Sequence, residues 1–315
     1  MKQVLVVYYS QSGQLTHVTK TLTAPLREAC VVDYLELKPL KPFPFPWDFL
    51  TFMGTFPEAV ALTPCPLAPF SLPEKHYDLV ILAYQPWFLS PSIPMTSFLT
   101  SDYAKKVLFN TPVITLIGCR NMWIMAQEKM KTLLQNLGAK VIDNIVLVDQ
   151  GNAFATFITT PRWMMSGKKD ALWGIFPHAG ISEAEIAKSV RFGRAIKAGL
   201  ASDKEKSFLP LCEGLGAVEV NQKLINSEKI GTKSFHIWGK CIQKFSKKEE
   251  AKRKVFILFY TLFLILMILT VVPLNMLLQS ILRKLNKARV LKEKAFYERP
   301  SGNGQHRMEE FLPNA

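Results

Sequence analysis

Cysteine is scarce in this 315-residue chain, and its five cysteines form no recognisable pattern. No CxxC motif occurs, and none of the cysteines stands at a metal-like spacing from the five histidines; they are Cys30, Cys65, Cys119, Cys212 and Cys241. An odd, scattered set is typical of reduced thiols in a cytosol and argues against a disulfide framework. The sequence therefore predicts neither disulfides nor a metal site.

Two familiar phosphate-binding motifs are also missing. The turn after the first apolar run, residues 10–16, contains no lysine, which excludes a Walker A loop. Neither GxGxxG nor its acidic ribose partner occurs, which argues against a Rossmann dinucleotide site. A signal peptide is absent as well, because the chain enters an apolar strand at once, so we expect the main domain to be cytosolic.

Basic residues are abundant but unevenly placed. The formal net charge is +14, and residues 240–254 and 283–299 each hold seven Lys or Arg against two Glu. A nucleic-acid-binding protein would spread such charge over a folded face, so no nucleic-acid partner is expected. Residues 202–254 are predicted to be a polar, basic linker, and residues 283–315 a basic and then disordered tail.

Between the two basic flanks lies a long apolar run. Residues 255–274 contain no Asp, Glu, Lys or Arg. Twenty helical residues rise about 30 Å, which matches the hydrocarbon core of a bilayer. We therefore predict a transmembrane segment at residues 255–282, a single-pass membrane location and membrane lipid as a partner. A buried core helix is the alternative, and Pro273 offers a second topology in which the helix bends back.

The first 201 residues alternate between apolar runs and helical periodicity. The predicted strands are residues 4–9, 31–37, 78–84, 112–118 and 140–149. Strands joined by helical crossovers give an α/β fold, a doubly wound five-stranded parallel sheet. In such sheets the ligand lies beyond the carboxyl ends of the strands, so the loops at residues 10–16, 85–92 and 118–123 are the candidate site.

Two long insertions interrupt this pattern. Residues 39–73 contain nine prolines, and residues 151–180 are rich in Phe, Trp and Met. Extra core or an oligomer contact would explain both. Long loops often carry function, however, so a lid or a lipophilic channel is the competing interpretation.

The first turn carries the chemistry of an anion site. Ser10, Ser12 and Thr16 supply hydroxyl groups, and Gly13 lets the backbone approach a ligand closely. The first amides of the following helix have no internal partner, and together with the helix dipole they favour a phosphate. An ordinary tight connection between strand and helix is the alternative.

The stretch YYSQSGQLT resembles the phosphate loop of the flavodoxin-like family, in which Ser/Thr-x-Ser/Thr-Gly-x-Thr follows the first strand. Ser10, Ser12 and Gly13 match, whereas Leu15 stands where the last threonine is expected and Thr16 follows one position late. The resemblance covers about residues 1–200 and implies FMN as cofactor. The FMN-binding residues it implies are Ser10, Gln11, Ser12, Gly13, Gln14, Thr16, Pro86, Trp87, Phe88, Gly118, Cys119, Arg120 and Asn121.

The other two loops agree with a flavin. Trp87 and Phe88 would stack on the isoalloxazine ring, and Asn121 and Trp123 would lie near its pyrimidine edge; simple packing is the alternative for both tryptophans. Arg120 would hold a phosphate, a ring carbonyl or a substrate carboxylate, unless it is a surface charge.

A second resemblance extends over most of the chain. VLVVYYSQSGQL, DYLELKPLKPFPFPW, FPEAV and the C-terminal apolar segment are similar to bacterial proteins labelled dialkylresorcinol condensing enzymes, which implies a role in alkyl- or aryl-polyene lipid biosynthesis. A condensing enzyme needs an activated cysteine with His and Asn partners. Cys119 is the only candidate in these loops and has no histidine at a recognisable spacing, so the residues do not support carbon–carbon condensation.

Three functions follow from these observations. The first is an FMN-dependent oxidoreductase that takes hydride from NAD(P)H and reduces a lipophilic acceptor. The second is a non-catalytic docking protein for a redox or biosynthetic partner, and the third is the condensing or cyclising enzyme of the second resemblance. No catalytic residue can be assigned from the sequence.

Overall fold

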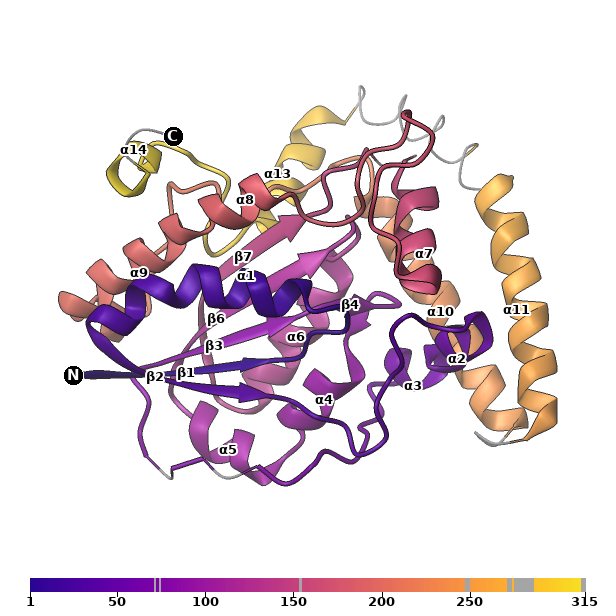
Figure 1. Cartoon of the computed structure of the whole chain (residues 1–315), viewed down its shortest axis with the longest axis horizontal. Helices are drawn as coiled ribbons and strands as arrows, with labels where there is room; N and C mark the ends of the chain where they lie inside the picture. The colour runs from indigo at the N-terminus through magenta and orange to yellow at the C-terminus, as the bar shows by residue number, and fades with distance from the viewer. Residues whose placement is uncertain are drawn as a thin grey trace.

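A five-stranded parallel sheet forms the centre of the molecule (Figure 1). The computed structural model describes residues 1–70, 72–73, 75–152, 155–246, 250–270, 274 and 286–312. The strands are β1 (Lys2–Tyr8), β2 (Cys30–Glu36), β3 (Leu79–Tyr84), β6 (Pro112–Cys119) and β7 (Lys140–Val148). Their order is β2-β1-β3-β6-β7, and every pair in this sheet is parallel. This is the strand order of the flavodoxin-like fold, so the sequence-based prediction of the sheet is confirmed.

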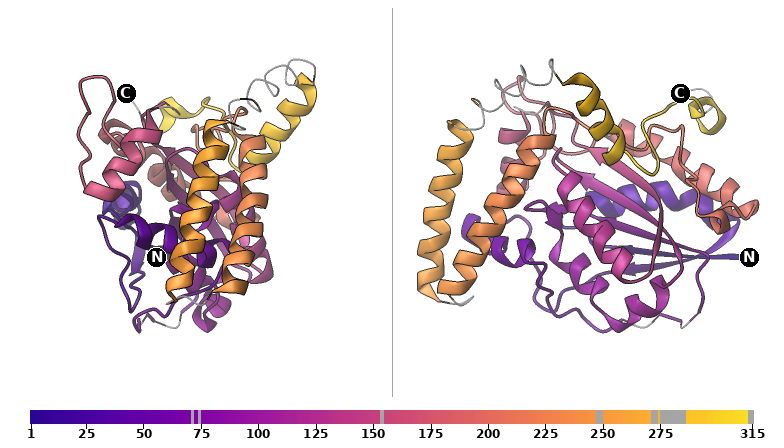
Figure 2. Two further views of the ribbon diagram at one scale, coloured as in Figure 1. Left: turned by 90° about the vertical axis from the view of Figure 1, so that its right-hand side faces the viewer. Right: turned by 180° about the vertical axis from the view of Figure 1, so that it is seen from behind.

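Helices cover both faces of the sheet (Figures 1 and 2). α1, α8 and α9 lie on one face, and α4, α5 and α6 lie on the other. Their bounds are α1 (Gln14–Thr23), α4 (Ile93–Leu99), α5 (Asp102–Leu108), α6 (Ile124–Asn136), α8 (Glu183–Lys188) and α9 (Val190–Ala201). Short 3-10 turns, η1 (Ala24–Glu28) and η2 (Lys204–Ser207), follow α1 and α9. Pro25 lies in the first turn of η1, directly after α1 ends, and the Ser182 hydroxyl caps α8 by accepting a hydrogen bond from the Glu185 amide at 3.2 Å.

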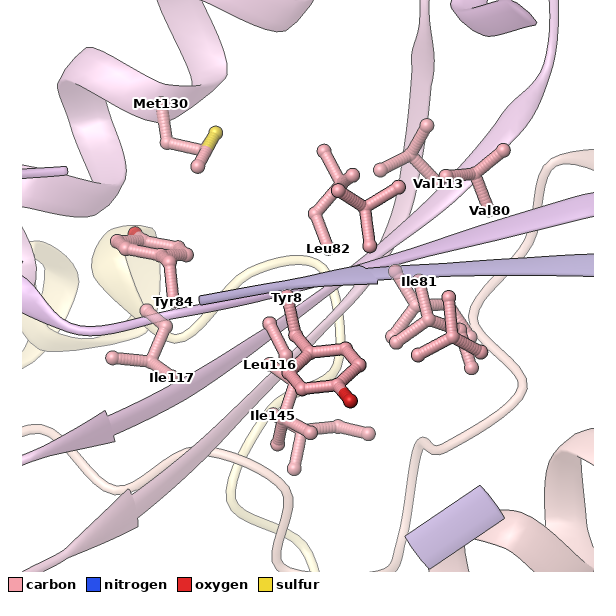
Figure 3. Close-up of a cluster of buried hydrophobic side chains, with 14 of the residues drawn as sticks. Tyr8, Val80, Ile81, Leu82, Tyr84, Val113, Leu116, Ile117, Met130 and Ile145 are labelled. Carbon is pink, nitrogen blue, oxygen red and sulfur yellow. The ribbon is translucent and has the colours of Figure 1, made fainter. Parts of the chain in front are cut away.

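Side chains alternate between the two faces of the central strands (Figure 3). On β3, Val80, Leu82 and Tyr84 point toward the face that carries Met130 of α6, while Ile81 points to the opposite face. All six residues of β3 are buried, because helices cover it on both sides. A near-continuous apolar run thus becomes a central strand.

Both insertions contain helices. Residues 39–73 include α2 (Phe49–Gly54) and α3 (Phe56–Val60), which lie between the proline clusters at residues 39–46 and 64–69, and residues 151–180 include α7 (Thr156–Ser166). The Trp47 amide donates a hydrogen bond to the Met164 carbonyl at 2.8 Å. The two insertions therefore meet at the carboxyl end of the sheet.

The predicted transmembrane helix is wrong. The apolar segment belongs to α11 (Ala251–Leu269), which begins with three consecutive cations before its apolar part. Within the described ranges, no helix is both long enough and apolar enough to cross a bilayer. The remainder of the predicted 255–282 span falls mainly on residues 271–273 and 275–282, which are outside those ranges. The predicted single-pass membrane location depends on this helix, so that prediction is wrong as well.

α11 packs instead on the globular part of the chain. It runs beside α10 (Ile225–Phe245), which occupies much of the predicted polar linker (Figure 2). The Tyr260 ring stacks on Phe56 of α3 with a centroid distance of 4.4 Å. Buried Arg253 forms an ion pair with Glu58 of α3, with Nη2 2.7 Å from Oε1. One face of α11 is therefore fixed to the first insertion.

The C-terminal segment also packs on the sheet, in place of the expected disordered tail. α13 (Lys287–Tyr297) and α14 (Met308–Phe311) flank a turn in which Ser301 is fully buried. The Ser301 hydroxyl donates to Asp143 of β7 at 2.7 Å, and the Leu211 amide donates to the same carboxyl at 2.7 Å. Burial raises the pKa of Asp143 to about 6. Edge strand β7 is thus covered by two later segments of the chain.

Candidate functional site

A cavity of about 440 Å³ lies at the carboxyl ends of β1, β3 and β6, where the fold predicts a ligand. Its size is that of small-molecule and cofactor sites. The three predicted loops and both insertions line it, together with one residue of α11. The predicted residues in its lining are Gln11, Ser12, Gln14, Pro86, Trp87, Phe88, Gly118, Cys119 and Arg120. Ser10, Gly13, Thr16 and Asn121 are not in its lining.

The turn from β1 into α1 presents free backbone amides beside this cavity. Gly13 precedes α1 with a φ of +82°, the left-handed region that glycine tolerates best. Among the described residues, no acceptor is hydrogen-bonded to the amides of residues 12–15. A Cβ added to Gly13 would meet no atom of the described residues within 4 Å. The turn therefore leaves both the donors and the space that an anionic group requires.

The polar side chains of this turn mostly hold the turn and the insertions in place. The Ser10 hydroxyl accepts a hydrogen bond from the Thr16 amide at 3.2 Å. Gln11 donates from Nε2 to the Pro44 carbonyl at 2.6 Å, which ties the turn to the first insertion. Gln14 pairs with the backbone of Ile181, at the end of the second insertion. Of the predicted phosphate ligands, Ser12 and Thr16 keep their hydroxyl groups without a partner among the described residues, and of these two Ser12 lines the cavity.

Leu15, which replaces the expected threonine, does not project into solvent. Its side chain is 1% exposed and packs against Gly118: if residue 118 had a Cβ atom, Leu15 Cδ1 would lie only 3.1 Å from it. The side chain therefore fills the space between the turn and the end of β6. Glycine at position 118 makes this close contact possible.

The loop after β3 forms a small hairpin, β4 (Pro86–Trp87) and β5 (Ser90–Pro91). Phe88 and Leu89 connect its strands with φ values of +49° and +57°. Non-glycine residues in this region are uncommon and concentrate at functional sites. Trp87 is 9% exposed and contacts Trp47 edge to face at a centroid distance of 5.6 Å. The hairpin thus joins the first insertion in an aromatic wall of the cavity.

The loop after β6 carries two shielded polar atoms, and one of the two residues, Arg120, lines the cavity. Arg120 Nε and Asn121 Oδ1 are both shielded from solvent and have no hydrogen-bond partner within the described part of the chain. The Arg120 guanidinium lies over the Phe157 ring at 3.9 Å. Burial lowers the pKa of Arg120, and the charge of Asp149 opposes this effect.

Two other residues of this region are well shielded. Burial raises the pKa of the Cys119 thiol well above its ordinary value. Trp123 is 2% exposed and lies outside the cavity lining, consistent with packing.

Sequence reasoning did not single out Asp149. Its carboxylate accepts hydrogen bonds from the amides of Gly151 at 2.8 Å and Gly180 at 2.6 Å, at the two ends of the second insertion. The Thr160 hydroxyl of α7 donates to it at 3.3 Å. An acidic residue at the carboxyl end of a predicted strand was the available signal. Asp149 closes the insertion into a loop beside the cavity.

Glu228 of α10 was also missed. This fully buried carboxyl accepts a hydrogen bond from the Met125 amide, at 3.0 Å, in the first turn of α6. Burial raises the pKa of Glu228 to about 8. The contact joins residues 103 positions apart, so no local pattern indicates it. It fixes the start of α6 directly after the Arg120 loop.

The remaining walls of the cavity are largely apolar. The first insertion contributes Phe45, Trp47 and Phe52. The second insertion contributes Trp163, Met164 and Met165 among others, and α11 contributes Leu264. Both insertions therefore line the cavity, as the interpretation of them as a lid or a lipophilic channel requires. The contribution of the apolar C-terminal segment was not expected.

Comparisons with known proteins found similar structures but no sequence relative. No protein-family model matches the chain, and no curated protein matches it in sequence. A flavoprotein in complex with FMN from Lactobacillus acidophilus NCFM is 16% identical, with 46% of this chain and 93% of that chain covered and a TM-score of 0.39. A flavodoxin from the domain Archaea is 10% identical, with 65% and 99% covered and a TM-score of 0.35. Oxidised flavodoxin 1 from Bacillus cereus is 11% identical, with 61% and 95% covered and a TM-score of 0.33.

The strand order, rather than these distant similarities, defines the fold of this chain. None of the matches bears on the resemblance to dialkylresorcinol condensing enzymes, which stays a prediction.

Proposed function

We propose that this chain is a flavoprotein that binds FMN in the cavity at the carboxyl ends of β1, β3 and β6, and that it acts on a lipophilic substrate. One observation carries the proposal: the amides of residues 12–15, which donate to no residue that the structure describes, adjoin an aromatic-walled cavity of about 440 Å³. Backbone amides at a helix start favour a phosphate, and aromatic walls favour a flat ring system. A single ligand that carries both groups would satisfy both parts of the site.

The residues present fit this cofactor. The amides of residues 12–15 and the Ser12 hydroxyl would hold the phosphate, since none of them is engaged by another described residue. Trp47, Trp87 and Trp163 would enclose the ring, and Arg120, which lines the cavity and whose Nε has no partner among the described residues, would be available to its polar edge or to a substrate. Bound FMN supplies hydride and electron transfer. The chain's own part is to orient the ring and to exclude water from it.

The walls of the cavity support a lipophilic substrate. Phe52, Phe88 and Leu264 belong both to the cavity lining and to an apolar cluster shared by α2, α3, α10 and α11. These side chains bring apolar surface to the site from three separate parts of the chain. A polar substrate would gain few hydrogen bonds from these side chains. An apolar substrate would bind favourably, because its apolar surface leaves water when it enters the cavity.

Replacement of Gly13 tests the placement of the phosphate. In Gly13→Ala the loop must strain or shift, because an alanine in the left-handed region costs about 1–2 kcal/mol. We expect FMN affinity to fall about fivefold to thirtyfold in a fluorescence titration. Gly174→Ala is the matched control, since Gly174 also has a positive φ (+68°) and open surroundings but lies away from the turn. Equal FMN affinity in the two variants would contradict the proposed phosphate site.

The reductant is tested on the same sample. We propose NAD(P)H as the hydride donor, and bleaching of the flavin by NADH or NADPH under argon is the expected result. Reduction only by an added redox protein would favour an electron carrier.

A further inference from the structure

Arg120 is a half-buried cation that lines the cavity. The Nε atom is shielded from solvent, and no hydrogen bond or ion pair joins the guanidinium to any residue that the structure describes. Two fully buried guanidinium groups of the chain are paired: Arg191 contacts Glu185 at 3.1 Å, and Arg253 contacts Glu58. A shielded polar atom without a hydrogen bond is costly, so such atoms are normally paired or serve a ligand.

The carboxylate of the same cavity, Asp149, accepts its hydrogen bonds from other residues. Asp149 lines the same cavity, but the Gly151 amide occupies one of its carboxylate oxygens. The Gly180 amide and the Thr160 hydroxyl occupy the other. Asp149 therefore stabilises the charge of Arg120 from a distance and leaves its donors free. The Phe157 ring, 3.9 Å from the guanidinium carbon, holds one face of the plane and leaves the N–H edge available.

The position of Arg120 separates it from the proposed phosphate site. It belongs to the loop after β6, whereas the free amides belong to the turn after β1. A planar guanidinium fork matches a carboxylate through two parallel hydrogen bonds. Around it, the cavity presents aromatic rings, methionines and Leu264. A molecule with one carboxylate and an apolar body is complementary to both features.

We propose that this cavity takes lipophilic carboxylates as substrates and that Arg120 is the residue that binds their carboxylate. The proposal rests on the proposed function, since it names the substrate class of the same site. Arg120 acts as a specificity-determining residue, because it distinguishes an acid from a neutral molecule of the same shape.

The test compares an acid with its neutral counterpart. Binding of 4-butylbenzoate and of 4-butylbenzyl alcohol to the full-length chain is measured by calorimetry at pH 7.5, with and without saturating FMN. We expect the wild type to bind the acid at least tenfold more tightly than the alcohol, as charge-assisted hydrogen bonds require. Arg120→Met should lose this preference and keep its affinity for the alcohol. Arg27→Met is the matched control, because Arg27 is exposed and absent from the cavity lining, and it should behave as wild type.

A wild type without the preference, or an Arg120→Met variant that keeps it, would overturn the proposal. Should Arg120→Met bind neither ligand, Arg120→Lys decides: a retained preference for the acid supports the proposal, and its loss overturns it. Flavin absorption of the same samples separates the two proposals. If the protein is colourless but prefers the acid in an Arg120-dependent way, the FMN proposal is refuted and the carboxylate proposal stands. If the protein is yellow but shows no preference for the acid, the carboxylate proposal is refuted and the FMN proposal stands.

Discussion

Gln14 and Ile181 are joined by two hydrogen bonds: Gln14 Nε2 donates to the Ile181 carbonyl at 3.0 Å, and the Ile181 amide donates to Gln14 Oε1 at 3.1 Å. This pair connects the first turn of α1 to the end of the second insertion, 167 residues later. The anion-binding turn and the aromatic insertion are therefore one structural unit.

Removal of this pair should loosen the insertion. In Gln14→Ala we expect the free energy of unfolding to fall by about 1–3 kcal/mol, since two partly buried hydrogen bonds are lost. Hydrogen exchange at residues 176–182 should accelerate. Gln150→Ala is the control, because exposed Gln150 makes one similar bond to the His178 carbonyl. Equal exchange in both variants would contradict the role given to Gln14.

Glu228 should make stability depend on pH. Its pKa is about 8 in the folded protein against an ordinary 4.5, so the native carboxyl stays protonated while the unfolded one ionises. The resulting stability is present below pH 4.5 and is lost as pH rises toward 8. Glu228→Gln keeps an acceptor for the Met125 amide but cannot ionise. Its stability relative to wild type should rise by up to about 1.4 kcal/mol per pH unit over this window and level off above pH 8.

Urea unfolding at pH 5.5, 7.0 and 8.5 measures this difference. Glu183→Gln is the control, because the Glu183 side chain is 68% exposed, and its difference from wild type should not change with pH in this way. A constant difference between Glu228→Gln and wild type would show that Glu228 ionises normally in the fold.

The ion pair between Arg253 and Glu58 should fix α11 in place. Arg253→Met leaves a largely buried carboxylate without its partner, which costs about 3–5 kcal/mol. Removal of both charges in Arg253→Met/Glu58→Gln should recover part of this loss. Lys254→Met is the control: it removes a cation from the same helix at an exposed position, without breaking the ion pair with Glu58. If Arg253→Met and Lys254→Met are equally stable in urea, the described packing of α11 is incorrect.

Cys119 should be inert toward alkylation. Burial holds its pKa well above the ordinary thiol value, so the reactive thiolate is scarce at pH 8. Mass spectrometry after brief exposure to iodoacetamide should find Cys119 unmodified in the folded protein and modified in urea. Rapid labelling of the folded protein would show that the thiol is accessible and ionised.

The sheet and the position of the site could be predicted because both depend on local patterns. Apolar runs such as residues 78–84 indicate buried strands, and the carboxyl-end rule then identifies the loops. The docking of α11 could not be predicted in the same way. Ile257, Tyr260 and Thr261 are buried, while Leu258 and Phe259 on the same helix are 52% and 62% exposed. Since both sides are apolar, the sequence shows no amphipathic period and resembles a membrane span.

The contacts that complete the site are similarly invisible in the sequence. Glu228 with Met125 and Gln14 with Ile181 each join residues more than 100 positions apart. Their side chains look like ordinary surface polar groups until the fold brings their partners close. Only tertiary structure shows which polar residues hold the site and which, like Arg120, keep free donors.

The most direct test of the central claim is a parallel titration of the flavin-free chain with FMN and with riboflavin, which lacks the phosphate. We expect one FMN to bind per chain, at least tenfold more tightly than riboflavin, because the amides of residues 12–15 engage the phosphate. Equal affinities, or no binding of either flavin, would contradict the claim.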